Sequence, residues 1–279
     1  GRAFSNRAGK LFPMTQRSIG SAVVVDNRRV ARDTVVLRLD FPLNDAVRAG
    51  QFAMLHPLRA GCLLPRPFSI LSSDRDGFEV LVKRVGKGSE ALADLDPGDE
   101  IRVLAPLGNG FDAERLSRTP TILVAGGVGI VPLHMLAKSL KDHAAPADRL
   151  IFGAQTPADL PRELFSDGSW QLWVEEGANG DLQQGRVTAG LSQALEEFTE
   201  AAVVTCGPTP MMRAVAEMAT DAGREVWVCL EEQMGCGSGV CRSCVLPSRP
   251  PTRMLTVCKD GPVFALEDIE FLSLAEVAL

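Results

Sequence analysis

The sequence predicts a small antiparallel β-barrel, then a parallel α/β domain, and last a short cysteine-rich segment. Three observations predict this order. Short β-branched stretches separated by turn residues fill the first part of the chain, strands then alternate with helices, and four of the seven cysteines crowd between Cys236 and Cys258. We place the three parts at residues 19–112, 113–230 and 231–279.

The predicted barrel rests on six short runs that are rich in β-branched and apolar residues. They are Ala22–Val25, Thr34–Leu39, Gln51–Leu55, Phe68–Leu71, Phe78–Val82 and Ile101–Leu104. Turn signals separate them, among them Asp26-Asn27 and Pro97-Gly98-Asp99. With one short helix at Ser89–Leu95, this pattern is typical of a small six-stranded antiparallel barrel.

After Phe111 the pattern changes to strands that alternate with helices. The expected strands are Thr121–Ala125, Leu150–Gly153, Trp170–Val174, Ala202–Thr205 and Glu225–Val228. The expected helices are Val131–Leu140, Val187–Phe198 and Met211–Ala222. Such alternation predicts a parallel sheet. The Cys-, Gly- and Pro-rich segment from Glu231 onward is not expected to continue it.

Composition excludes two kinds of partner. A net charge of −6 argues against the basic face that nucleic-acid binding needs, and 5% aromatics with no tyrosine argue against a base-stacking platform. No apolar run approaches the roughly 20 residues of a membrane helix. Residues 1–18 are basic and contain no acid, and we interpret them as an extension or a remnant outside the fold. Clustered cysteines indicate a metal or iron–sulfur site in a reducing compartment, so a cytoplasmic protein is expected.

The four clustered cysteines follow the spacing C-x4-C-x2-C-x13-C. They are Cys236, Cys241, Cys244 and Cys258. The first three have the spacing of plant-type [2Fe–2S] centres, in which four thiolates hold two irons. Gly235, Gly237 and Gly239 allow the loop to curl and to bring backbone N–H groups toward the sulfurs. Zinc is the alternative, although zinc sites usually pair two C-x2–4-C units across a longer spacer. The scattered Cys62, Cys206 and Cys229 are expected to be small buried residues.

Two motifs in the barrel suggest a flavin nucleotide. In Arg66-Pro67-Phe68-Ser69 the Arg can meet a phosphate, and the following backbone and Ser can address an isoalloxazine ring. Alone, the motif is more often an ordinary surface Arg beside a core Phe. Leu81-Val82-Lys83 then leads into Gly86-Lys87-Gly88-Ser89 and a short helix, whose N-terminus can hold a pyrophosphate.

The α/β part carries two turns suited to a dinucleotide. Gly126-Gly127-Val128-Gly129 lies between a strand and a helix and resembles the G-x-G-x-x-G fingerprint without matching it. Cys206-Gly207-Pro208 repeats this arrangement after another strand. Each turn is also compatible with a tight turn that binds nothing. Since Gly153–Thr156 supplies no Arg for a 2′-phosphate, NAD is favoured over NADP.

These motifs together resemble the ferredoxin reductase-like flavoprotein superfamily and, within it, the family of dihydroorotate dehydrogenase B electron transfer subunits. The resemblance covers the chain after residue 18. It adds Pro106–Phe111 and, most specifically, the stretches Glu232–Cys241 and Val257–Phe264. The family favours Thr at Ser89 and often Arg at Lys83, so the phosphate contacts of these two residues differ from its pattern.

The resemblance implies FAD held by Arg66–Ser69, Leu81–Lys83 and Gly88-Ser89, and one [2Fe–2S] cluster on the four cysteines. It also implies a separate FMN-containing catalytic subunit, two of each chain in a heterotetramer, that oxidises dihydroorotate in pyrimidine biosynthesis. A cluster passes single electrons whereas nicotinamide accepts a hydride, so FAD must lie between the cluster and NAD. No side chain is expected to be catalytic by itself.

Two alternatives stay open. One is the related subunit of an NADH-dependent ferredoxin:NADP oxidoreductase or of a sulfite reductase, which shares the barrel, the nucleotide domain and a C-terminal cluster. The other is a non-enzymatic interaction protein that binds zinc. The stretch Cys258–Phe264 favours the dihydroorotate family over the first, and the intact flavin and cluster motifs argue against the second.

Overall fold

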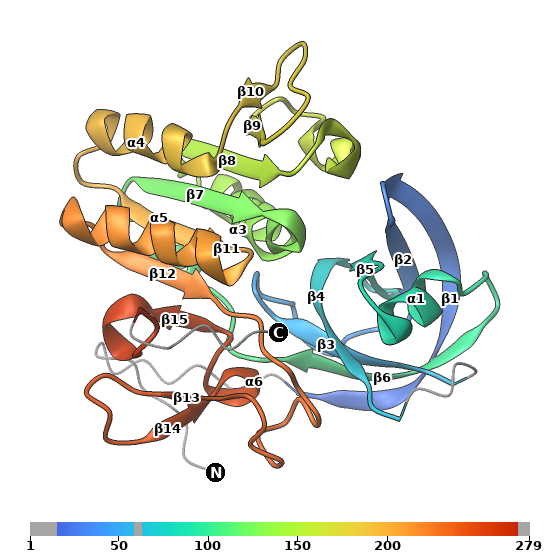
Figure 1. Ribbon diagram of the computed structural model, residues 1–279. Helices are drawn as coiled ribbons and strands as arrows, with labels where there is room; N and C mark the ends of the chain where they lie inside the picture. The colour runs from blue at the N-terminus through green and yellow to red at the C-terminus, as the bar shows by residue number, and fades with distance from the viewer. Residues whose placement is uncertain (1–15, 59–62, 273–279) are drawn as a thin grey trace.

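The computed structural model describes residues 16–58 and 63–272. Six antiparallel strands close into a barrel in the order β1-β2-β5-β4-β3-β6. The strands are β1 (Ser18–Ala31), β2 (Thr34–Asp40), β3 (Phe52–Pro57), β4 (Arg66–Ser73), β5 (Phe78–Lys83) and β6 (Glu100–Leu107). Figure 1 shows the barrel beside the α/β part, with the short helix α1 (Lys87–Ala93) at its edge. Inward-facing apolar side chains such as Leu37 and Phe78 fill it.

The first strand is longer than the sequence predicts. Asp26-Asn27, interpreted as a turn, lies inside β1 next to an irregularity in its pairing with β2 between Val24 and Asp26. The side chain of Asn27 donates to the carbonyl oxygens of Ala93 (3.1 Å) and Leu95 (2.6 Å) at the end of α1. Asn27 therefore ties the strand to the end of this helix, and the turn prediction was wrong.

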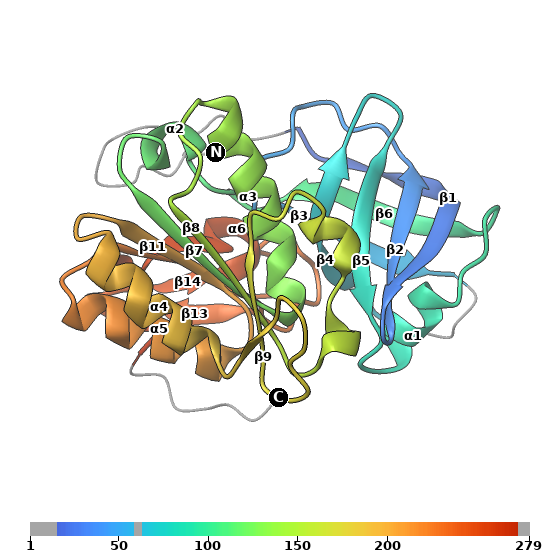
Figure 2. The same cartoon turned by 90° about the horizontal axis from the view of Figure 1, so that it is seen from above.

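The α/β part is a sheet of seven strands in the order β10-β9-β8-β7-β11-β12-β15. The six parallel strands are β7 (Thr121–Gly126), β8 (Arg149–Ala154), β9 (Gln171–Val174), β10 (Gln183–Gln184), β11 (Ala202–Cys206) and β12 (Val226–Cys229). Helix α3 (Ile130–Asp142) packs on one face, and α4 (Val187–Glu197) and α5 (Thr209–Asp221) pack on the other, as Figure 2 shows. The short helix α2 (Ala113–Leu116) connects the barrel to this sheet. The predicted parallel sheet is confirmed.

The C-terminal segment adds a strand that the sequence did not predict. After the hairpin of β13 (Val245–Pro247) and β14 (Met254–Thr256) and the turn of helix α6 (Val257–Asp260), β15 (Val263–Ala265) pairs antiparallel with β12. It covers an edge of the sheet that would otherwise expose unpaired N–H and C=O groups. Three residues are too few to show a periodicity in the sequence.

Asn109 fastens this segment to the end of the barrel. Its amide nitrogen donates to the carbonyl oxygens of Asp260 (3.1 Å) and Val263 (2.8 Å), and its amide oxygen accepts from the N–H of Val263 (3.2 Å). The predicted fold class, a barrel with an α/β domain and a small C-terminal segment, is confirmed. In the part of the chain that the structure describes, no helix is long and apolar enough to cross a membrane.

Candidate cofactor and cluster sites

The first predicted flavin motif forms the start of β4, where it pairs with β3. Arg66 lies opposite Leu55, Pro67 opposite Met54, Phe68 opposite Ala53, and Ser69 opposite Phe52. All four motif residues are half-buried. The motif therefore presents its backbone and its polar side chains at the rim of the barrel.

Arg66 and Gly88 come from separate motifs and are in contact. A Cβ atom on Gly88 would lie 2.9 Å from Nε of Arg66 and 3.3 Å from its Cζ. Any larger residue at 88 would push the guanidinium away from the first turn of α1. The contact places the cation beside the N-terminal turn of a helix, and both features favour a phosphate group.

Ser89 shapes the loop that precedes α1. Its hydroxyl accepts from the N–H groups of Val85 (2.9 Å) and Gly86 (3.2 Å) and donates to the carbonyl of Gly86 (3.0 Å). These bonds occupy the hydroxyl within its own loop. A direct contact of Ser89 with a ligand stays a prediction.

The predicted flavin contacts Leu81, Val82 and Lys83 lie on two opposite faces of β5. Leu81 and Lys83 line a cleft between the barrel and the α/β sheet. Val82 points the other way and is fully buried in the barrel core. Because neighbouring residues of a strand face opposite sides, only the backbone of Val82 is available to a ligand in the cleft.

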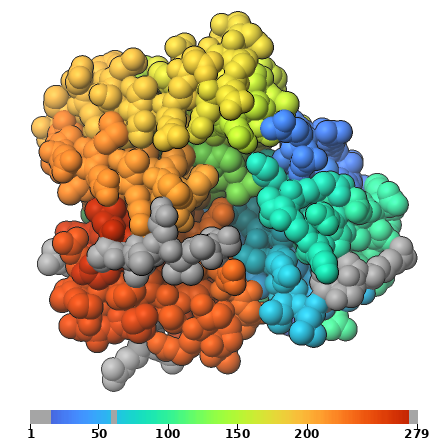
Figure 3. Space-filling view, in the orientation of Figure 1, coloured from blue at the N-terminus to red at the C-terminus, as the bar shows by residue number. Residues whose placement is uncertain are grey.

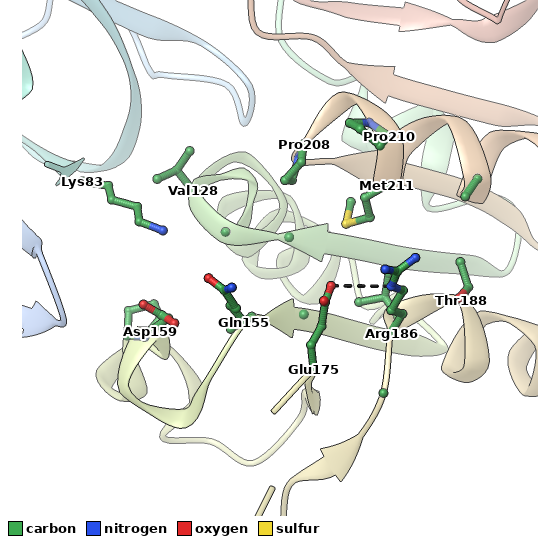
Figure 4. A pocket seen from close by; sticks show the side chains of 18 of the residues that line it. Lys83, Val128, Gln155, Asp159, Glu175, Arg186, Thr188, Pro208, Pro210 and Met211 are labelled. Carbon is green, nitrogen blue, oxygen red and sulfur yellow. Dashed lines mark ion pairs between the residues drawn. The ribbon is translucent and has the colours of Figure 1, made fainter. Parts of the chain in front are cut away.

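The cleft has a volume of about 620 Å³ and opens at the carboxyl ends of the parallel strands (Figure 4). Parallel α/β sheets bind ligands at this edge. The lining comes from the barrel, from the segments that follow β7, β8, β9, β10 and β11, and from the N-terminal parts of α4 and α5. Its predicted members are Leu81, Lys83, Gly126, Gly127 and Pro208. Gly129, Cys206 and Gly207 are not among its lining residues.

The predicted glycines have different physical roles. A Cβ on Gly126 would lie 2.4 Å from Sδ of Met211, and one on Gly129 would lie 2.3 Å from the carbonyl oxygen of Cys206. A Cβ on Gly207 would lie 2.9 Å from the carbonyl oxygen of Gly126. These contacts lock the two turns together. Gly127 differs, because its φ is +55° and the space around it is open to the cleft. Its backbone is therefore accessible from the cleft, and a role of Gly127 in binding a ligand stays a prediction.

Sequence reasoning missed three charged residues in the cleft, namely Asp159, Glu175 and Arg186. Glu175 follows β9 directly, and Arg186 directly precedes α4. The position of Glu175 after a predicted strand was a usable signal, since ligands bind at that end of the sheet. Arg186 follows a strand of only two residues, β10, which no sequence pattern reveals.

Cys206 and Cys229 end two neighbouring parallel strands and are both buried. A hydrogen bond between the two thiols and their burial raise the pKa of Cys206. These two cysteines are buried as expected, while Cys62 lies outside the described residues.

In the cysteine-rich segment, backbone N–H groups point at three of the four sulfurs. Cys236 accepts from the N–H groups of Ser238 and Cys241, both at 3.4 Å. Cys258 accepts from Gly239 at 3.1 Å, and Cys244 accepts from Cys258 at 3.5 Å. Bonds of this kind stabilise negative charge on thiolate and sulfide.

The cysteines lie in two pairs. Cys236 is hydrogen bonded to Cys241, and Cys244 to Cys258. Within the described ranges, no group of three or more His, Cys, Asp or Glu side chains is arranged to hold a metal ion. Two pairs of thiolates suit a cluster of two irons with two protein ligands each, whereas a zinc ion needs four ligands around one point.

Proton affinity differs along this segment. Burial opposes ionisation of Cys236, but the N–H donors of Cys241 and Ser238 outweigh it and lower the pKa of Cys236 to about 6. Burial and the neighbouring Cys244 raise the pKa of Cys258 to about 12. A thiol with a low pKa, such as that of Cys236, is a ready metal ligand. Positively charged iron between the two pairs would offset the cost of ionising the buried thiol of Cys258.

The cysteine loop touches the barrel. A Cβ on Gly237 would lie 2.4 Å from Cγ of Met54 and 3.0 Å from Cδ1 of Leu107, and the φ of Gly237 is +65°. Met54 lies opposite Pro67 of the flavin motif. One side chain of β3 therefore separates the cysteine loop from that motif, and Figure 3 shows the C-terminal segment directly beside the barrel.

Comparison with known proteins agrees with this architecture. Residues 21–111 match the oxidoreductase FAD-binding domain, and residues 231–270 match the iron–sulfur cluster binding domain of dihydroorotate dehydrogenase B. A structure described as an NADH-dependent reduced ferredoxin–NADP oxidoreductase superposes with a TM-score of 0.79 at 26% identity, covering 91% of both chains. A ferredoxin NADP⁺ reductase from Neisseria gonorrhoeae, at 18% identity and a TM-score of 0.62, shares the fold. The chain is thus an oxidoreductase flavoprotein that binds FAD and an iron–sulfur cluster.

Sequence relatives narrow the class further. The electron transfer subunit of dihydroorotate dehydrogenase B (NAD(+)) from Bacillus caldolyticus is 36% identical, over 88% of this chain and 96% of the relative. The subunit of the same name from Caldanaerobacter subterraneus is 32% identical, over 90% and 98%. This chain belongs to the family of dihydroorotate dehydrogenase B (NAD(+)) electron transfer subunits.

Proposed function

We propose that this chain takes electrons from a separate FMN-containing subunit that oxidises dihydroorotate to orotate, and delivers them through a [2Fe–2S] cluster and FAD to NAD⁺ in pyrimidine biosynthesis. Membership of the family supports this function. The observation that carries it is the contact of Gly237 with Met54, because Met54 pairs with Pro67 of the predicted flavin motif on β4. Reducing conditions in the cytoplasm would keep the thiols available.

The cluster would be held by Cys236 with Cys241 and by Cys244 with Cys258. The N–H groups of Ser238 and Gly239 would stabilise the added charge of the reduced cluster. Met54 and Leu107 hold the loop against the barrel and exclude water from this junction.

FAD would be held at the barrel rim. Arg66, fixed against Gly88, would bind phosphate, while Pro67, Phe68 and Ser69 would offer backbone groups and the Ser hydroxyl to the ring system. Ser89 would keep the loop in shape for the phosphate. On β5, Leu81 and Lys83 would face the ligand, and Val82 would contribute its backbone.

NAD would occupy the cleft. Gly127 opens the backbone to a pyrophosphate, and Gly126 and Pro208 complete the wall. Gly129, Cys206 and Gly207 would act by holding the two turns together. FAD, when bound, supplies both single-electron and hydride chemistry, which the cluster and nicotinamide each supply only in part.

The catalytic partner would dock on the cluster face, and two of each chain would form a heterotetramer. Cys241 is exposed, and the neighbouring Val240 is 81% exposed. An apolar side chain beside an exposed ligand is suited to an interface that must bring two redox centres close together.

A second candidate function follows from the likeness to the NADH-dependent reduced ferredoxin–NADP oxidoreductase. In that case ferredoxin would replace the dihydroorotate-oxidising subunit as the electron partner. The family match of residues 231–270 to the dihydroorotate dehydrogenase B domain favours the first function.

Two measurements test the proposal. An anaerobic visible spectrum, with flavin, iron and sulfide assays, should show about one FAD and two irons per chain. The purified chain mixed with its FMN-containing partner should then reduce NAD⁺ in the presence of dihydroorotate. Zinc without sulfide or flavin would contradict the cofactor assignment. Reduction that depends on ferredoxin and ignores dihydroorotate would support the second candidate instead.

A further inference from the structure

One sulfur of the cysteine-rich segment lies beside a side-chain hydroxyl. Backbone N–H groups point at the sulfurs of Cys236, Cys244 and Cys258, as described above. The sulfur of Cys241 lies 3.3 Å from the hydroxyl oxygen of Ser243. Both residues are exposed, so core packing does not force them together. The contact therefore depends on how the loop itself holds the hydroxyl.

Two backbone groups hold the hydroxyl of Ser243 in place. Its oxygen accepts from the N–H of Gly235 at 3.2 Å and donates to the carbonyl of Gln233 at 3.3 Å. Both partners come from the start of the loop, eight and ten residues earlier in the chain. A Cβ on Gly235 would lie 3.4 Å from the sulfur of Cys241, which is ordinary contact distance. The turn that anchors the hydroxyl thus also packs against the sulfur.

The direction of the contact between Ser243 and Cys241 depends on the proton of the thiol. A serine hydroxyl has one proton to donate and two lone pairs that accept. A free thiol can donate to the hydroxyl, which then gives its own proton to the carbonyl of Gln233. A cysteine that binds iron is a thiolate, so its sulfur can only accept. With Cys241 as a ligand, the hydroxyl of Ser243 is the donor, and the carbonyl and the sulfur share it.

Negative charge decides how this donor is shared. An electron added to an iron–sulfur cluster places part of its charge on the cysteine sulfurs. Hydrogen bonds to a charged acceptor are stronger than those to a neutral carbonyl such as that of Gln233. The hydroxyl of Ser243 therefore bonds more strongly to Cys241 in the reduced state than in the oxidised state. Because it is already held at 3.3 Å, it needs less ordering than a water molecule at the same place.

We infer that Ser243 is a positioning residue that raises the reduction potential of the iron–sulfur cluster, by donating a hydrogen bond from its hydroxyl to the sulfur of Cys241. In this reduction the cluster gains one electron, no covalent bond breaks, and the proton stays on the serine oxygen. A higher potential favours entry of an electron from the partner subunit. The inference rests on the proposed assignment of Cys241 as a cluster ligand.

The test is an anaerobic redox titration of the holoprotein with dithionite as the reductant. Electron paramagnetic resonance measures the reduced cluster, and visible absorption follows the flavin in the same sample. In Ser243→Ala the equilibrium constant for reduction of the cluster should fall about tenfold, which lowers the potential by about 59 mV for one electron. The flavin potential should not change, because the described hydrogen-bond partners of Ser243 all lie in the cysteine loop.

A second pair of variants separates the hydroxyl from the shape of the side chain. Ser243→Thr keeps the hydroxyl, and Ser243→Val has nearly the same shape as the Thr variant without it. The exposed position leaves room for both side chains. The Thr variant should keep the wild-type potential, and the Val variant should have the lowered potential of Ser243→Ala.

Ser248→Ala is the matched control in the same segment. The hydroxyl of Ser248 donates to the carbonyl of Pro250 at 2.8 Å and accepts from the N–H of Arg253 at 3.2 Å. These bonds shape the hairpin of β13 and β14 and involve no cysteine. The potential of the cluster should therefore be the same in Ser248→Ala and in the wild type.

Iron and sulfide assays on every variant distinguish the ways in which the test can fail. An unchanged or higher potential in Ser243→Ala, with the iron retained, overturns the inference and leaves the proposed function intact. Equal potentials in the Thr and Val variants do the same. If neither variant without the hydroxyl keeps its iron, Ser243 assembles the loop rather than setting the potential, and the inference is wrong. A wild-type chain without iron and sulfide contradicts the proposed function itself.

Discussion

The cysteine-rich segment and the cleft between the barrel and the sheet are built in opposite ways. All four predicted cluster ligands lie between Cys236 and Cys258, on one loop and the helix turn α6. The cleft takes its lining from the barrel, from five strand ends and from two helices. A site made by one segment depends on the backbone of that segment, whereas an assembled site depends on how distant segments pack.

The largest expected effect concerns the single-segment site. In Cys244→Ser, iron and sulfide should fall to about a tenth or less of the wild-type content, because a hydroxyl replaces a buried thiolate ligand. FAD should stay near one per chain, since the barrel motifs are separate from the cluster loop. Iron, sulfide and flavin assays on one sample measure both quantities.

Cys229→Ala is the control for this prediction. Cys229 is equally buried but ends strand β12 and is not among the predicted ligands. It should keep its full iron content. Two irons retained in Cys244→Ser would remove Cys244 from the ligand set.

Gly237→Ala should give the next largest effect. The substitution places a side chain at a positive φ and makes it clash with Met54. The free energy of unfolding should therefore fall by about 2–5 kcal/mol. Urea unfolding of the holoprotein measures this change. Gly168→Ala is the control, because its φ of +67° is similar and the space around it is open. A loss no larger than that of Gly168→Ala would mean that the loop does not press on the barrel.

Gly127→Ala tests the cleft, and it again replaces a glycine that has a positive φ. Its φ is +55° and a Cβ would contact nothing, so the stability cost should be only about 1–2 kcal/mol. The added methyl group would enter the cleft, and the dissociation constant for NAD⁺ should rise about tenfold. Calorimetry with NAD⁺ measures it, again beside Gly168→Ala. An unchanged dissociation constant would exclude this turn as the pyrophosphate site.

The same contrast explains what the sequence could predict. Spacing alone was enough to predict a set of cluster cysteines, because ligands on one loop keep a fixed separation along the chain. It could not pair Glu175 with Arg186, since that contact depends on a two-residue strand and on the side chain of Gln184, which donates to the carbonyl of Glu175. Gly153–Thr156 contains no Arg, but Arg186 from another segment lines the cleft.

Two errors in the predicted fold have a similar origin. Asp26-Asn27 has the composition of a turn, but Asn27 finds its partners at the end of α1. β15 has only three residues, too few for a strand pattern in the sequence, and it becomes a strand by pairing with β12. In both cases a tertiary contact decided the local structure.

The smallest expected effect is a pH dependence on the α/β side of the molecule. His134 lies on α3, and burial and the nearby Lys138 lower its pKa to about 4 from an ordinary 6.5, while Asp167 acts in the opposite sense. Between these two pH values the unfolded chain binds a proton that the folded chain does not. The difference between these two pKa values corresponds to about 3 kcal/mol, and water at the half-buried ring reduces the effect. Stability should therefore fall by about 1–2 kcal/mol as the pH drops from about 6.5 toward 4. The change should be absent in His134→Gln and retained in His143→Gln, which alters an exposed histidine at the end of the same helix. Urea midpoints at several pH values measure the slope, and equal slopes in wild type and His134→Gln would show that His134 is not held neutral by its packing.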